Sequence, residues 1–129
     1  MMINSAKFIK RRRDIFMYLT FHNFGRMILY PWGYDHRVDN KNEYELKRVG
    51  TMGSRAMGLS YIVGNSAKVL YPAAGGSDDW AHGEAGIPYS YTIELPGDDW
   101  FIVYRKNIRK VSEEAWRGTL SMIQSVKRF

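Results

Sequence analysis

Between residues 89 and 95 the chain alternates between apolar and polar positions. One face of this segment carries Tyr89, Tyr91, Ile93 and Leu95, and the other carries Ser90, Thr92 and Glu94. A period of two predicts a β-strand, which Pro96 and Gly97 end. Glu94 is therefore expected at the carboxyl end of a strand, where open α/β sheets collect ligands. The alternative is a strand-end glutamate that faces only water.

Two further strands are predicted near the N-terminus. Residues 15–21 (IFMYLTF) are almost continuously apolar, which favours a strand buried on both faces of a parallel or mixed sheet. His22 follows at the carboxyl end of that strand, and a hydrogen-bonded structural histidine is the alternative to a metal ligand there. Residues 26–32 (RMILYPW) predict a second strand that Pro31 and Gly33 end.

Three helices are predicted after residue 42, from helical spacing or from capping residues. From Glu43 to about Tyr61 a face of apolar or small residues recurs at steps of three or four, namely Leu46, Val49, Gly53, Ala56, Met57 and Ser60. Ser77 is a suitable N-cap for a short helix with Asp78 and Asp79 in its first turn, where the helix dipole alone would also favour carboxylates. Ser112 is expected to cap the last helix, whose buried stripe would be Trp116, Leu120, Ile123 and Val126.

Length and composition indicate one globular domain. The chain has 129 residues, 45% of them hydrophobic and 25% charged, and no linker or repeat divides it. No apolar run approaches the ~20 residues of a membrane-spanning helix, and no secretory signal is recognisable at the N-terminus. The absence of cysteine excludes disulfides and thiolate metal ligands.

The net charge of +6 does not by itself indicate a nucleic-acid partner. Basic residues cluster at Lys7, Lys10, Arg11, Arg12, Arg13 and again at Arg105, Lys106, Arg109, Lys110. The sequence shows neither a basic groove interleaved with exposed aromatics nor a known binding motif. Residues 10–13 are expected to close a helix, where cations suit the dipole. Neither nucleic acid nor a membrane is therefore expected as a partner.

Three segments together resemble the zinc metallocarboxypeptidases of the pancreatic carboxypeptidase A/B family. Residues 69–95 (VLYPAAGGSDDWAHGEAGIPYSYTIEL) are similar to the C-terminal half of the catalytic domain. Residues 20–34 (TFHNFGRMILYPWGY) resemble the strand with the family's third zinc-binding histidine, and residues 113–116 (EEAW) resemble the start of its last helix. The resemblance implies an incomplete α/β domain over residues 1–129, with part of a mixed twisted sheet flanked by helices.

The same resemblance implies functional roles. His22 would bind Zn²⁺, and Glu94 would be the catalytic base that later carries the proton to the leaving amine. Tyr71 and Asn23 would contact the substrate, a peptide or protein C-terminus. Asp78 would lie in the pocket for the last side chain and select Lys or Arg, as in B-type enzymes of the family. The activity would be that of a secreted hydrolase, a protease.

Other parts of the family pattern are missing. The chain has no H-x-x-E motif for the first two zinc ligands, its remaining histidines are His36 and His82, and the family's substrate-binding arginines are absent. The zinc site is thus expected to be incomplete, the chain alone inactive, and the missing N-terminal half a required partner. A non-catalytic binding protein that kept the half-fold is the alternative. Asn23-Phe24 also replaces the Ser-Tyr of the digestive enzymes, and residues 97–105 are shorter than their counterpart.

Overall fold

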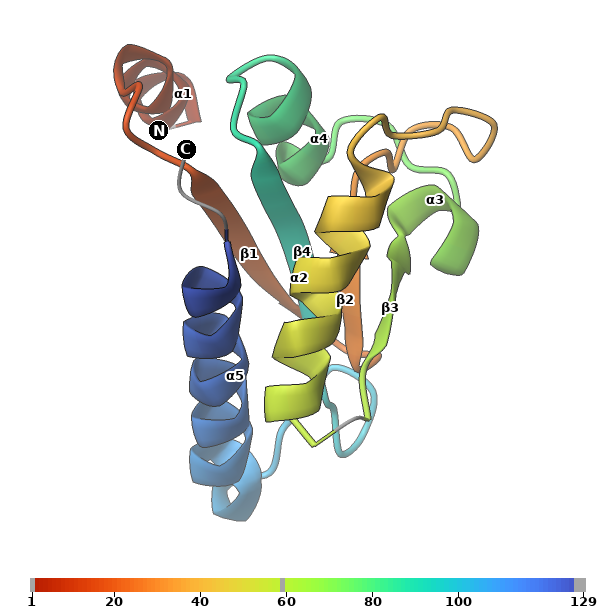
Figure 1. Cartoon of the computed structure of the whole chain (residues 1–129). Helices are drawn as coiled ribbons and strands as arrows, with labels where there is room; N and C mark the ends of the chain where they lie inside the picture. The colour runs from red at the N-terminus through yellow and green to blue at the C-terminus, as the bar shows by residue number, and fades with distance from the viewer. Residues whose placement is uncertain (1, 59, 127–129) are drawn as a thin grey trace.

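The structure is a computed structural model that describes residues 2–58 and 60–126. The strands are β1 (Met17–Asn23), β2 (Met27–Tyr30), β3 (Ile62–Asn65) and β4 (Tyr89–Leu95), and the helices are α1 (Met2–Arg11), α2 (Glu43–Ala56), α3 (Ser66–Val69), α4 (Ser77–Gly83) and α5 (Arg105–Ser125) (Figure 1). No helix in this part of the chain combines the length and apolar character needed to cross a bilayer.

The four strands form one mixed sheet in the order β1-β4-β2-β3. β1 runs parallel to β4, β2 runs parallel to β3, and β2 is antiparallel to β4. The predicted α/β fold with a mixed sheet flanked by helices is therefore confirmed. The carboxyl ends of β1 and β4 lie side by side as a direct result of their parallel pairing.

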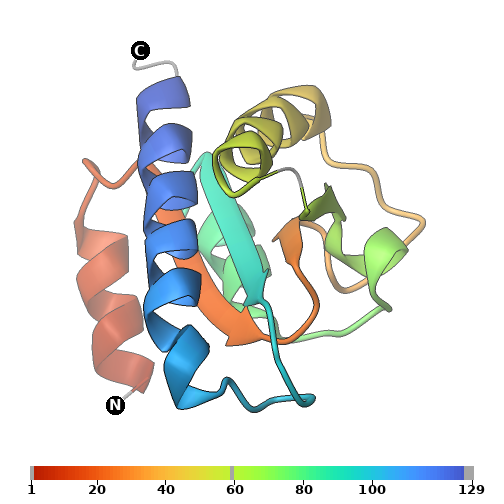
Figure 2. The same cartoon turned by 90° about the horizontal axis from the view of Figure 1, so that it is seen from below.

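Helices α2 and α5 pack side by side over one face of the sheet (Figure 2). The core beneath them consists of Ile28, Tyr30, Leu46, Val49, Met57, Tyr61, Tyr89, Tyr91, Ile93 and Met122. Gly53 of α2 allows the close approach, because a Cβ there would lie 2.7 Å from Met122 Cγ. Gly118 of α5 does the same against Met57.

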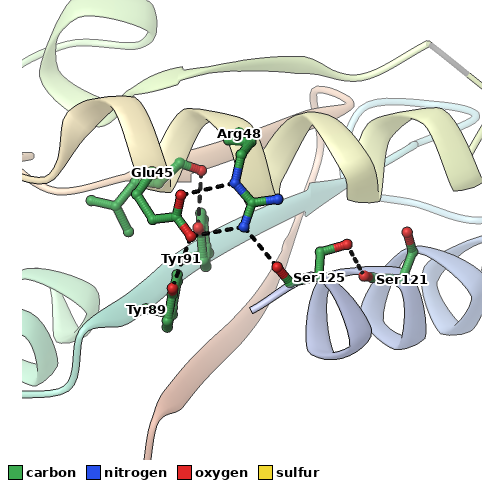
Figure 3. A network of polar contacts seen from close by, with 7 residues as sticks. Glu45, Arg48, Tyr89, Tyr91, Ser121 and Ser125 are labelled. Atoms are coloured by element: carbon green, nitrogen blue, oxygen red, sulfur yellow. Dashed lines mark hydrogen bonds and ion pairs between the residues drawn. The ribbon is translucent and has the colours of Figure 1, made fainter. Parts of the chain in front are cut away.

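Polar contacts fasten α2 to β4 and to the end of α5 (Figure 3). The Tyr89 hydroxyl donates to Glu45 Oε1 at 3.0 Å, and the Tyr91 hydroxyl donates to an α2 backbone carbonyl at 2.9 Å. Arg48 donates to Glu45 and, at 2.7 Å, to the carbonyl oxygen of Ser125. Because these bonds join three elements, they fix β4 beneath α2 and thereby fix the register of the strand that carries Glu94.

The opposite face of β4 carries Ser90, Thr92 and Glu94, and α4 packs on it. The Ser90 hydroxyl donates to the backbone carbonyl of Asp78 at 2.8 Å. Alternation of side chains across the sheet thus separates a structural face under α2 and α5 from a polar face under α4. Glu94 belongs to the polar face.

The strand predicted at residues 15–21 differs from β1 in bounds and in burial. β1 begins at Met17 and continues through Asn23, and none of its side chains is fully buried. The prediction of burial on both faces is wrong because β1 is the first strand in the sheet order and has β4 as its one neighbour among the described residues. Apolar content alone does not distinguish an edge strand from a central one.

The predicted helix at residues 43–61 is too long, and a strand follows it that the sequence analysis missed. α2 ends at Ala56, and Gly58 adopts a φ of +97°, the left-handed conformation that commonly ends helices. Leu59 lies outside the described residues. β3 and α3, each of four residues, follow where no elements were predicted.

Two cap assignments and one helix face are also corrected. α4 begins at Ser77 as predicted, with Asp78 and Asp79 in its first turn, but its N-cap is Gly76. α5 begins at Arg105, so Ser112 lies inside the helix. Its buried residues are Glu114, Gly118 and Met122, while Trp116 and Leu120 of the predicted stripe are exposed.

Candidate active site

His22 and Glu94 are partners in the parallel ladder between β1 and β4. In-register residues of neighbouring strands project from the same face, so both side chains extend from the polar face at the carboxyl end of the sheet. Thr20 and Thr92 form the preceding pair on that face. The structure therefore brings together a histidine and a carboxylate that are 72 positions apart in the sequence.

The electrostatic environment of Glu94 disfavours its charged form. Burial raises the pKa of the Glu94 carboxyl above its ordinary value, and the positive charge of His22 partly offsets that rise. His22 is exposed, with its Nε2 3.1 Å from the Thr20 hydroxyl oxygen. A half-buried carboxyl with a raised pKa beside an exposed imidazole is suited to moving protons.

Thr20 is a site residue that the sequence analysis did not name. It stands two positions before His22, so the period of two places it on the same face. Its hydroxyl contacts the imidazole and helps to hold the ring in place. The sequence alone could have identified Thr20, because in a strand the residue two positions before His22 lies on the same face.

The adjacent carboxylates of α4 differ in how their oxygens are used. Asp79 accepts hydrogen bonds from the backbone N–H groups of Gly33, at 2.8 and 3.0 Å, and of Tyr34, at 3.1 Å. Burial raises the pKa of Asp79 and the charge of Asp78 adds to the rise, while the bond from Gly33 opposes it. Asp79 therefore holds the loop that follows β2.

Asp78 is 6% exposed, and its carboxylate accepts no hydrogen bond from any residue in the described part of the chain. Its main chain is anchored to β4 through Ser90. Ser90 lies four residues before Glu94 on the same face, about 13 Å along the strand at the usual rise. Because no described residue donates to it, this carboxylate is available to accept a charge-assisted hydrogen bond from a cationic ligand group.

Tyr71 and Asn23 lie outside this central group. Tyr71 is exposed, on the connection between α3 and α4. Gly75 on that connection adopts a φ of +85°, a left-handed conformation that glycine allows and that lets the chain turn sharply. Asn23 ends β1, and its side-chain amide donates to the carbonyl oxygen of Phe101 at 2.6 Å. Asn23 therefore ties the residues after His22 to the loop after β4.

The described residues do not provide a complete zinc site. They contain no group of three or more His, Cys, Asp or Glu side chains that could hold a metal ion. His82 lies on α4, with its Nδ1 2.9 Å from the carbonyl oxygen of Ile87 in the loop that follows, and His36 is exposed on the loop before α2. A catalytic zinc ion needs about three protein ligands, so His22 together with the other described residues does not complete such a site.

Comparisons with known proteins agree on a family. The zinc carboxypeptidase family model matches residues 2–118. Carboxypeptidase B of Astacus astacus is 37% identical over 120 residues, which cover 88% of this chain and 39% of that protein. Human carboxypeptidase O is 38% identical over 128 residues, covering 94% of this chain and 34% of that protein.

A solved structure shows the same architecture. Bovine thrombin-activatable fibrinolysis inhibitor, in complex with tick carboxypeptidase inhibitor, superposes with a TM-score of 0.86 at 30% identity. The match covers 95% of this chain and 45% of that one. The chain thus spans between a third and a half of the length of these relatives.

Proposed function

Since the chain belongs to the zinc carboxypeptidase family, we propose that it carries part of the active site of an enzyme that removes C-terminal Lys or Arg from peptides. The supporting observation is the pairing of His22 with Glu94 on the polar face of the sheet. We propose that these residues form the C-terminal half of the catalytic domain, and that the missing N-terminal half is the partner it needs. A secreted location, which the pancreatic family implies, belongs to the same proposal.

Glu94 is proposed as the catalytic base. Peptide hydrolysis needs a group that takes a proton from the attacking water and later gives one to the leaving amine. A single carboxyl can both accept and donate the proton when its protonated form is accessible. Burial raises the pKa of Glu94 and so favours that protonated form. Tyr71, which is exposed beside a glycine turn, is proposed to contact the bound peptide.

The residues present do not fit a zinc ion on their own, so the remaining ligands are proposed to come from polypeptide outside these 129 residues. We therefore expect the isolated chain to bind zinc no more tightly than about micromolar and to lack carboxypeptidase activity. Dialysis against zinc followed by metal analysis measures this. Tight stoichiometric zinc that is lost in His22→Ala would contradict it.

Asp78 is proposed to select the last side chain of the substrate. Its carboxylate accepts no hydrogen bond from the described residues, whereas that of the neighbouring Asp79 accepts bonds from the backbone N–H groups of Gly33 and Tyr34. Lys or Arg would supply a charge-assisted bond, and an apolar side chain would leave the carboxylate unpaired at a cost of about 1 to 3 kcal/mol. That range corresponds to roughly tenfold to more than a hundredfold discrimination.

A complete enzyme containing this chain tests the proposal. The ratio of kcat/KM for peptides ending in Lys or Arg to that for Phe or Leu should exceed one, and Asp78→Ile should reverse it. Asp79→Asn is the matched control, and it should leave the ratio unchanged because a ratio does not depend on the fraction of folded enzyme. A preference for Phe or Leu with Asp78 intact would show that the basic specificity is wrong.

A further inference from the structure

The loop between β4 and α5 exposes three consecutive large apolar side chains. Trp100 is 73% exposed, Phe101 69% and Ile102 58%. We refer to residues 99–102 as the aromatic turn. Apolar residues scattered singly over a surface need no explanation, but a contiguous group of this size marks an interaction site.

The aromatic turn is held in one shape. The N–H of Ile102 donates to the carbonyl of Asp99 at 2.9 Å, and the N–H of Asp98 donates to the carbonyl of Ile102 at 2.9 Å. Trp100 has a φ of +52°, which a non-glycine residue adopts only when its surroundings hold it there. The turn is therefore a fixed projection.

Contacts at the base of the turn add to its rigidity. The ring of Phe24 makes edge contacts with those of Trp100 and Phe101, at centroid distances of 6.1 and 5.1 Å. The Asp98 carboxylate accepts bonds from the Tyr104 N–H and the Asn107 amide, both at 2.7 Å. These bonds connect the turn directly to the start of α5.

Cations concentrate beside this turn, at a position where they do not stabilise the fold. The basic cluster consists of Arg105, Lys106, Arg109 and Lys110, all exposed in the first two turns of α5. The positive end of the helix dipole disfavours cations there. Arg109 pairs with Glu113 at 2.8 Å, whereas the other three have no acidic partner among the residues that the structure describes.

We propose that the aromatic turn and the basic cluster form a docking surface for an anionic lipid bilayer. Indole and phenyl rings suit the boundary between headgroups and acyl chains, and nearby Lys and Arg bind anionic headgroups. Both parts lie at the same end of the molecule, away from α1 (Figure 1). This proposal departs from the expectation of no membrane partner, which rested on the lack of a spanning segment, because a docking surface needs none.

The shape of the surface favours a bilayer over a polymer. An extended acidic peptide or a single-stranded nucleic acid binds along a groove. The three apolar side chains of the aromatic turn are more than half exposed, and exposed side chains of this kind can enter a fluid interface without a complementary hollow. Asp98, Asp99 and Glu113 are the acidic residues beside these cations. The carboxylates of Asp98 and Glu113 are engaged by Tyr104, Asn107 and Arg109, so Arg105, Lys106 and Lys110 keep their charges for headgroups.

Vesicle binding by the full 129-residue chain tests the proposal. The vesicles contain either pure phosphatidylcholine or three parts phosphatidylcholine to one part phosphatidylserine. We expect partitioning onto the anionic vesicles to be about tenfold stronger or more, and to weaken at high salt because screening reduces headgroup attraction. Partitioning that is equal on the two vesicle types overturns the proposal.

Matched variants distinguish binding through this surface from binding caused by net charge or by exposed apolar residues elsewhere. Arg105→Gln with Lys106→Gln should lower binding at least tenfold, whereas Arg11→Gln with Arg13→Gln, the same charge change at the other end of the molecule, should not. Trp100→Asn should also lower it, and Asn tolerates the left-handed backbone. Trp116→Gln, at a tryptophan on α5 that is also mostly exposed, should leave it unchanged.

Two further outcomes would overturn the proposal. If both charge pairs lower binding equally, net charge alone accounts for it. If the chain ignores anionic vesicles but binds polyglutamate or a single-stranded oligonucleotide through Trp100 and Lys106, the surface serves an acidic polymer instead. Circular dichroism of each variant establishes that it remains folded.

Discussion

Glu94 occupies a position that favours proton transfer at the expense of stability. Its carboxyl is half-buried, and no hydrogen bond to its side chain is present among the described residues. The nearest compensating charge is the exposed His22. A carboxyl in this setting resists ionisation, which is useful in a group that must both accept and release a proton.

Glu94→Gln should stabilise the chain at neutral pH. The folded-state pKa of Glu94 is raised, so its contribution to stability is fully present below the unfolded-state pKa and is lost as pH rises through the folded-state pKa. The glutamine variant should therefore gain in urea midpoint over wild type as pH rises through that range. Glu113→Gln, at an exposed glutamate, serves as the control. A variant that is less stable at pH 7, with the pH dependence unchanged, would contradict this expectation.

Asp79→Asn should destabilise the fold, although it removes a carboxylate whose pKa is raised. Asparagine keeps one acceptor oxygen and places an NH₂ group near the N–H donors of Gly33 and Tyr34. Leaving a half-buried N–H unsatisfied costs about 1 to 3 kcal/mol. Urea unfolding measures the loss, and Asp78→Asn, where no internal donor is lost, should change stability much less. Equal losses for the two variants would show that the loop does not depend on Asp79.

At the scale of the elements, the sequence patterns identified β4, β2 and α4 because each is marked by alternation, an apolar run or a capping position. β3 was missed because its four residues include Gly64 and Asn65, so neither alternation nor an apolar run is present. The end of α2 could have been placed, since Gly58 follows the last helical residues and supplies a left-handed terminus.

The face of α5 was wrong for a different physical reason. Large apolar residues were assigned to the core, but α2 and α5 approach so closely that glycine at 118 is required where they meet. The buried stripe also includes Glu114, which pairs with Arg26 at 2.9 Å. A buried glutamate cannot be recognised until its partner from another element is known.

Paired substitutions on α5 distinguish the two faces. Met122→Ala should lower the free energy of unfolding by about 2 to 5 kcal/mol, because Met122 is fully buried against Gly53. Trp116→Ala should change it by less than about 0.5 kcal/mol, since Trp116 is exposed. Thermal or urea unfolding of both variants provides the comparison, and the reverse ranking would restore the face predicted from sequence.

For the molecule as a whole, the sequence identified candidate residues but not their arrangement. The order of His22, Tyr71, Asp78 and Glu94 is legible in the sequence, whereas the pairing of residue 22 with residue 94 depends on strand register. Register is set by contacts distant in sequence, such as those of Glu45 and Arg48 with β4 and α5. The distinct uses of Asp78 and Asp79 likewise emerge only once the loop after β2 is in place.

The exposed edge of β1 should make the isolated chain self-associate or unfold easily. Within the described residues β1 pairs with β4 alone, and Phe16 and Phe21 are exposed at or near it. Residues 15–23 contain no lysine or proline, which natural edge strands use to prevent pairing with other chains.

Sedimentation velocity over a range of concentrations should therefore show association, and Phe21→Lys should shift the chain toward monomer. Tyr44→Lys, which adds the same charge at an exposed aromatic on α2, should not. A monomer with a sharp, concentration-independent thermal transition well above ~65 °C, the upper range for ordinary mesophile domains, would refute the expectation. That result would mean that the open edge of β1 is stable in water without a neighbouring strand.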